Sequence, residues 1–178
     1  MQKIDLKKFH IISFIFVSIL GVILHFLYNW SGENSFVGIF SAINESIWEH
    51  LKLIFYPMLL SSIIGYFVLG KDIENYWCSR VIGILSAIIF VVIFFYTYTG
   101  VLGKMIDAIN ILSFFIAVGI GEYVTYRNML KEKTCNKNLP FYIIVTLIFY
   151  FTLFTFAPPQ IGIFKDPVDG SCVICNIN

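Results

Sequence analysis

Residues 81–103 read VIGILSAIIFVVIFFYTYTGVLG and contain no charged side chain. A helix needs roughly 20 apolar residues to cross the hydrocarbon core of a bilayer, so this stretch is long enough to span one. Its Leu, Ile and Phe residues follow one another without the alternation of a barrel strand, which favours a helix. The same charge-free pattern recurs in four other stretches: Phe9–Gly32, Leu53–Gly70, Ala108–Gly121 and Asn138–Phe164.

The overall composition agrees with a lipid environment. Of the 178 residues, 58% are hydrophobic and 13% are charged, and the mean hydropathy is +0.84. A water-soluble domain carries about 25% charged residues, because its surface must be hydrated. The formal net charge of +1 gives no basic footprint for nucleic acid, so the lipid bilayer is the expected partner. A protein partner and a homo-oligomer both remain open.

We therefore expect an all-α fold, a polytopic membrane helix bundle that forms a single domain over residues 1–178. The stretch that begins at Ala108 is long enough to span only if it continues through Glu122. The Glu122 carboxylate is then expected to snorkel towards the headgroups near Arg127. About five transmembrane helices are predicted, followed by an extracytoplasmic tail at 158–178. The spans are expected at about 9–28, 51–70, 81–100, 107–126 and 139–157.

Basic residues predict the orientation, because Lys and Arg concentrate on the cytoplasmic side of membrane proteins. An N-in, C-out topology puts nine of the twelve Lys and Arg residues on the cytoplasmic side and three on the outer side. The inner set is Lys3, Lys7, Lys8, Lys71, Arg80, Arg127, Lys131, Lys133 and Lys137, and the outer set is Lys52, Lys104 and Lys165.

The cysteines divide in the same way. Cys78 and Cys135 map to cytoplasmic loops, whereas Cys172 and Cys175 form a C-x-x-C pair in the outer tail. That pair fits a disulfide, a redox pair or half of a metal site, and its role stays open.

The densest polar segment is SAINESIWEHLK, residues 41–52, just before the second span. Ser41 or Asn44 is a suitable helix cap, so we expect one long helix over 41–70 with an amphipathic start and a bend at Pro57. On such a helix Glu45, Glu49 and Lys52 share one stripe.

These polar residues, with His25 at the same expected depth, predict an outward-facing site. Histidine and carboxylate ligands suit zinc and similar divalent ions, although no His-Glu-x-x-His motif is present. The alternative is an interfacial helix with a solvated charged face, anchored by Trp48. The ligand-binding candidates are His25, Asn44, Glu45, Trp48, Glu49, His50, Lys52 and Asp107, and the metal-ligand candidates among them are His25, Glu45, Glu49 and His50.

Two regions of the sequence resemble a known family. The first combines HFLYNWSG at 25–32, NESIWEHLK at 44–52 and Pro57. The second is the closing region, with PPQI at 158–161 and FKDP at 164–167. Together they resemble an uncharacterised family of small bacterial membrane proteins, catalogued as domain of unknown function 6512. The resemblance implies a bacterial plasma membrane location and a functional role for residues 44–52, and it implies no activity.

Three functions are consistent with the sequence. The first is binding or transport of a cation or small polar solute. The second is a membrane-embedded hydrolase that uses a metal-activated water, with catalytic residues that the sequence leaves unknown. The third is a non-catalytic accessory protein in which the polar cluster only joins helices.

Overall fold

The computed structural model describes residues 5–131, 135–136 and 138–167, and this part of the chain is helical, as predicted. Five long helices are α1 (Leu6–Trp30), α3 (Ile47–Val68), α4 (Tyr76–Leu102), α5 (Asp107–Met129) and α6 (Leu139–Phe156). Short helical segments are α2 (Ser35–Gly38), η1 (Gly70–Asp72) and η2 (Gly162–Phe164). All five long helices are long and apolar enough to cross a membrane, which confirms the predicted number of spans.

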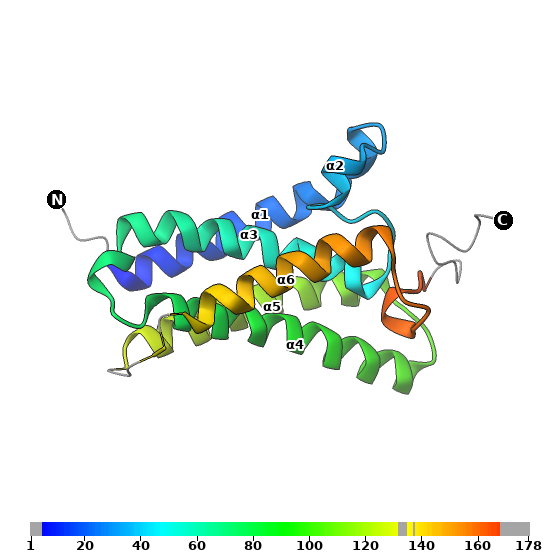
Figure 1. The fold of residues 1–178 in the computed structure, drawn as a ribbon. Coiled ribbons are helices and arrows are strands. Elements are labelled where there is room, and N and C mark those ends of the chain that lie inside the picture. Colours follow the sequence, from blue (N-terminus) through cyan, green and yellow to red (C-terminus); the bar gives the residue numbers. More distant parts are fainter. Residues whose placement is uncertain (1–4, 132–134, 137, 168–178) are drawn as a thin grey trace.

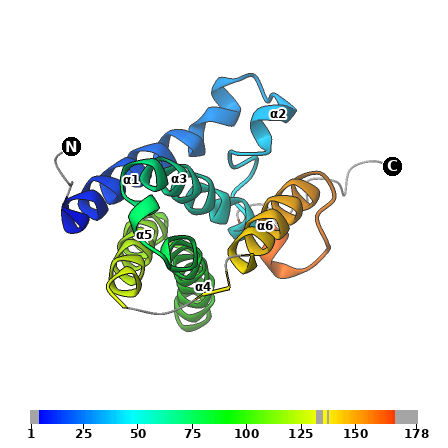
Figure 2. The ribbon, with the colours of Figure 1, turned by 60° about the vertical axis from the view of Figure 1, so that its left-hand side comes forward.

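The long helices lie side by side and form one bundle, with α2 standing off the end at which α1 finishes (Figure 1). Helices α1, α3, α4 and α5 make the main body, and α6 lies to one side of it (Figure 2). The central helix is α3, the most buried of the five. The apolar core holds one or more residues from each long helix: Val17, Leu51, Ile54, Phe55, Met58, Ile84, Ala87, Val91, Ala117, Val118 and Phe151.

Large apolar side chains also cover the outside of the bundle. Examples are Ile19 on α1, Ile93 on α4 and Phe149 on α6, each more than half exposed. A water-exposed protein rarely shows such a continuous apolar surface, whereas contact with lipid tails favours it.

Helices α1 and α3 approach closely at Gly21. Pro57 has no N–H, so the carbonyl of Leu53 lacks its usual donor within α3. A β-carbon at position 21 would lie 2.8 Å from that carbonyl oxygen, and it would also collide with the Phe114 ring. Only glycine therefore lets the α1 backbone pack against this part of α3.

The expected start of the second long helix was wrong. We expected it at Ser41, but α3 begins at Ile47, because the Ser46 hydroxyl accepts the Glu49 N–H and caps the helix. The Asn44 side chain accepts the Ser46 N–H, and the Ser41 hydroxyl donates to the Val37 carbonyl. These short-range bonds stabilise turns in place of an earlier helical start.

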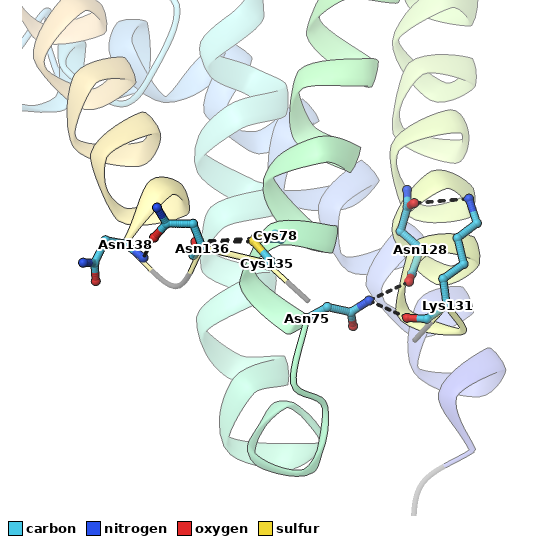
Figure 3. The surroundings of a disulfide bond; sticks show 7 residues. All are labelled: Asn75, Cys78, Asn128, Lys131, Cys135, Asn136 and Asn138. Atoms are coloured by element: carbon cyan, nitrogen blue, oxygen red, sulfur yellow. Dashed lines mark hydrogen bonds between the residues drawn. A yellow bond between two sulfur atoms is a disulfide. The ribbon is translucent and has the colours of Figure 1, made fainter. Parts of the chain in front are cut away.

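At the opposite end of the bundle, Cys78 and Cys135 form a disulfide (Figure 3). Cys78 lies in the first turn of α4 and not in a loop as expected. Beside it, the Asn75 side chain donates to the carbonyls of Asn128 and Lys131, at 2.9 and 2.8 Å, and so ties the α4 start to the end of α5 (Figure 3).

Candidate metal site at the end of the bundle

Three of the predicted site residues meet where α1 ends and α3 begins. His25 lies near the end of α1, His50 in the first turn of α3, and Glu45 in the loop just before the Ser46 cap. One potential ligand atom from each residue lies within 4.8 Å of the others. Within the described residues, this is the group of His, Cys, Asp and Glu side chains that is close enough to hold one metal ion.

The His50 ring is oriented by the backbone. Its Nδ1 lies 2.9 Å from the Ser46 carbonyl oxygen, which can only accept, so Nδ1 carries the hydrogen. Its Nε2 then faces the Glu45 carboxylate at 3.4 Å. Metal-binding histidines commonly donate their other ring N–H to a carbonyl in this way, and the bond fixes the tautomer.

Two electron-rich atoms face each other across this 3.4 Å gap, so a positive charge is needed between them. Either a proton on His50 Nε2 or a metal ion supplies it. A tetrahedral ion with ligand bonds of about 2.1 Å separates its ligand atoms by about 3.4 Å. The Glu45–His50 pair already has that separation, and His25, whose ligand atom lies within 4.8 Å of the other two, would need to approach by at most about 1.4 Å.

Glu45 stays ionised near neutral pH. The hydrogen bond from His50 holds the pKa of the Glu45 carboxyl below its usual value, against the opposing effect of partial burial. The nearby His25 acts in the same direction. The carboxylate is about half exposed, so it is accessible to an ion arriving from outside.

Glu49 points away from this cluster and into the protein. Its carboxylate lies 2.6 Å from Lys52 Nζ and accepts the Ile43 N–H at 3.0 Å. Lys52 also donates to the Gly38 carbonyl and to the Thr155 hydroxyl. Glu49 and Lys52 are almost fully buried and join α2, α3 and α6, so the predicted stripe is divided between a site and a structural ion pair.

The other candidates lie outside the three-residue cluster. Asn44 turns the chain before α3, and Asp107 is exposed in the first turn of α5. Trp48 packs against Phe151, Phe154 and Phe164, and it anchors α3 to α6 and to η2.

The closing motif lies beside the site. Phe164 packs against Trp48 with the rings tilted and their centroids 4.8 Å apart, and Asp166 accepts the Glu45 N–H at 3.0 Å. The two regions that carried the family resemblance thus contact each other in space. Cys172 and Cys175 lie outside the described residues.

A cleft of about 120 Å³ opens directly below the metal-ligand cluster. Its walls come from α1, α3, α4 and α5 and are mostly apolar. The lining residues are Gly21, Val22, His25, Glu45, Ile47, His50, Leu53, Ile54, Val91, Phe95, Met105, Asn110, Ile111, Ser113, Phe114 and Phe115.

A second polar network was missed from the sequence. Glu122 does not snorkel to the headgroups as expected, since it is 3% exposed and makes an ion pair with Arg80 at 2.9 Å. It also accepts from His10 Nδ1 at 2.6 Å and from the Ser13 hydroxyl at 2.7 Å. Arg80, counted among the basic residues on the cytoplasmic side, is instead fully buried in α4 and also donates to the Ser62 hydroxyl.

This network joins α1, α3, α4 and α5 through hydrogen bonds. A buried charge in a span must be paired, so the acidic Glu122 signalled a basic partner within the bundle. The sequence contained that signal, but counting every basic residue as lying on one side of the membrane or the other left no basic partner within the bundle.

The fold defines a multi-pass helical protein of the membrane type, with a His-Glu-His cluster at one end of its bundle. The chain belongs to the Family of unknown function (DUF6512), whose model matches residues 1–174. No curated protein and no solved structure matches it.

Proposed function

We propose that this protein binds a divalent metal ion, with zinc as the best match, through His25, Glu45 and His50. The observation that supports the proposal most directly is the approach of three ligand atoms to within 4.8 Å from three separate segments of the chain. Two imidazoles and a carboxylate form a ligand set that zinc uses in proteins, and three protein ligands leave one position open.

We place this site on the outer face of a bacterial plasma membrane, as the basic residues and the family resemblance suggest. Arg80 and Lys52 are buried and drop out of the inner and outer sets, but the remaining basic residues still divide eight to two in favour of N-in. With the N-terminus inside, the end of α1 and the cluster beside it lie on the outer side of the membrane.

Binding is favoured over transport because the core beneath the site is apolar. Val17, Ile54 and Phe55 are among the buried residues between the cluster and the Arg80–Glu122 network. An ion that left the cluster along the bundle axis would lose all its ligands in this layer.

The cleft favours a second candidate function, a metal-dependent hydrolase. The open coordination position would hold a water molecule next to the cleft, and the ion would lower the pKa of that water. The hydroxide would add to an ester carbonyl carbon, the bond to the alcohol oxygen would break, and the alcohol would leave with a proton. Turnover of an ester by the zinc-loaded protein, lost on chelation, tests this function.

Zinc titration of purified protein tests the binding proposal. We expect about one zinc per chain in the wild type and an affinity at least about tenfold lower in Glu45→Gln and His50→Ala, since even outer-shell changes cost 10–100-fold. Glu74→Gln is the matched control, because Glu74 is an exposed carboxylate remote in sequence from the cluster. Wild-type protein without bound zinc, or equal zinc affinity in Glu45→Gln and Glu74→Gln, would leave only a structural or accessory role.

A further inference from the structure

The cleft below the His25–Glu45–His50 cluster has a polar end and apolar walls, which suit an amphiphile. Its polar end carries His25, Glu45 and His50, and its walls carry side chains such as Leu53, Phe95 and Phe114. A small polar solute would gain little from these walls, because apart from Asn110 and Ser113 they offer it no hydrogen-bonding side chain.

The position of the cleft within the bundle gives access from the lipid. It extends from His25 to Gly21, which is nine residues before the end of α1 and thus about 13 Å below it along the helix. Its wall residue Ile111, on α5, is 60% exposed on the apolar surface of the bundle. A chain lying among the membrane lipids can therefore reach the cleft from the side.

The volume limits what enters. A cavity of about 120 Å³ is smaller than the ~150 Å³ apolar cavity that holds one benzene molecule, and well below the 300 Å³ of a drug-sized pocket. The cleft has room for a few carbon atoms next to the headgroup, and the rest of a long chain would lie outside it, in lipid.

Charge selects the headgroup. A divalent ion with two neutral imidazoles and the Glu45 carboxylate leaves one net positive charge and an open coordination position. An anionic oxygen neutralises that charge and fills that position.

We propose that the metal ion and the cleft together bind an anionic amphiphile, whose carboxylate or phosphate oxygen coordinates the ion while the first carbons of its chain occupy the cleft. The inference rests on the metal site proposed above and adds the class of ligand.

Photolabelling in phosphatidylcholine nanodiscs tests this proposal. The probe is a long-chain carboxylic acid with a diazirine close to its carboxyl, added to wild-type protein with zinc or with a chelator. We expect zinc-dependent labelling within the α1 and α5 segments that line the cleft. An unlabelled carboxylic acid or an alkyl phosphate should compete, and which of them competes better identifies the headgroup, whereas the methyl ester of the acid should not compete.

Two neighbouring substitutions provide a matched pair. Ile111 lines the cleft and Leu112 does not, yet the two side chains are 60% and 59% exposed. Ile111→Trp should weaken zinc-dependent labelling about tenfold, equivalent to losing the burial of about two methylene groups, and Leu112→Trp should leave it unchanged. The wild-type competition series is independent of whether either variant folds.

The outcomes separate the two proposals. Absence of zinc binding in the wild type overturns the metal site and the amphiphile site together. Zinc binding with labelling that ignores zinc, or competition by the methyl ester equal to that of the acid, overturns the amphiphile site alone. Equal labelling of Ile111→Trp and Leu112→Trp also overturns it.

Discussion

The Glu45 carboxylate lies 3.4 Å from Nε2 of His50, whose other ring nitrogen donates to the Ser46 carbonyl. This relationship exists because α3 begins at Ile47 and not earlier. Were residues 41–46 helical, Glu45 would be fixed on the same helix, five positions before His50 and on a different face. As a loop residue directly before the cap, it can fold back towards the His50 ring.

Zinc binding should weaken as the pH falls from 7 to 5. The depressed pKa of Glu45, caused by the hydrogen bond from His50, keeps its carboxylate ionised through this range, so Glu45 does not cause the loss. Histidine has an ordinary pKa of about 6.5, and protonation of His25 and His50 removes the lone pairs that the ion needs. Zinc titration at several pH values measures the effect. Affinity that is constant down to pH 5 would argue against histidine ligands.

The depressed pKa of Glu45 also determines how the stability of the metal-free protein depends on pH. A carboxyl whose pKa is lower in the folded state stabilises the fold above its unfolded pKa, and this stabilisation is lost as the pH falls through the folded-state pKa. The contribution of Glu45 should therefore disappear only below about pH 4, the ordinary range of a glutamate. Because the side chain is half exposed, solvent screening keeps this contribution small.

Glu49→Gln should lower stability without lowering the zinc content. The substitution leaves the buried Lys52 ammonium without its carboxylate, so we expect a loss of about 1–3 kcal/mol in the free energy of unfolding. Unfolding by titration with SDS, together with metal analysis of the same preparation, checks both results. A variant that kept its stability but lost zinc would place Glu49 in the metal site.

The Arg80–Glu122 pair should act as a structural unit. Arg80→Ala leaves the buried Glu122 carboxylate without its guanidinium partner, with His10 and Ser13 still in contact, and it should cost about 3–5 kcal/mol. The double substitution Arg80→Met with Glu122→Leu removes both charges and should restore much of that loss. The same SDS titration compares the variants. A double variant no more stable than Arg80→Ala would show that the charge pair has a role beyond mutual neutralisation.

Much of this architecture was predictable from the sequence, and the reason is physical. Runs such as 81–103 must be helical in lipid, since only a helix satisfies its own backbone there. The equal expected depth of His25 and the 44–52 segment brought His25 near the polar cluster, but it left open whether His25 meets His50 or the glutamates. The separation of Glu45, at the cluster, from Glu49, in a buried ion pair, did not follow from the sequence. It depends on whether Ser41, Asn44 or Ser46 caps the helix. Glu122 within a span indicated that a basic partner was needed, but the identity of that partner as Arg80 did not follow, because packing decides how each helix is rotated within the bundle.

The N-in orientation that we propose makes a prediction about Cys78 and Cys135. It places these two cysteines at the cytoplasmic end of the bundle, where the reducing environment keeps thiols free. In a background with Cys172→Ser and Cys175→Ser, intact cells should therefore show thiols that react with a membrane-permeant maleimide and not with a charged one. The purified protein should form the disulfide in air.

The opposite labelling result would have a clear meaning. A disulfide already present in intact cells, opened by an impermeant reductant, would put this end of the bundle outside. The His25–Glu45–His50 cluster lies at the other end and would then face the cytoplasm.

X-ray absorption of the zinc-loaded protein identifies the atoms that bind the ion. We expect two imidazole nitrogens at 2.0–2.1 Å and oxygen at 2.0–2.2 Å around it. In His50→Ala, the X-ray absorption spectrum should show one imidazole ligand fewer, and the affinity for zinc should fall. A sulfur shell at about 2.3 Å would instead assign the ion to cysteines and would contradict the site proposed for His25, Glu45 and His50.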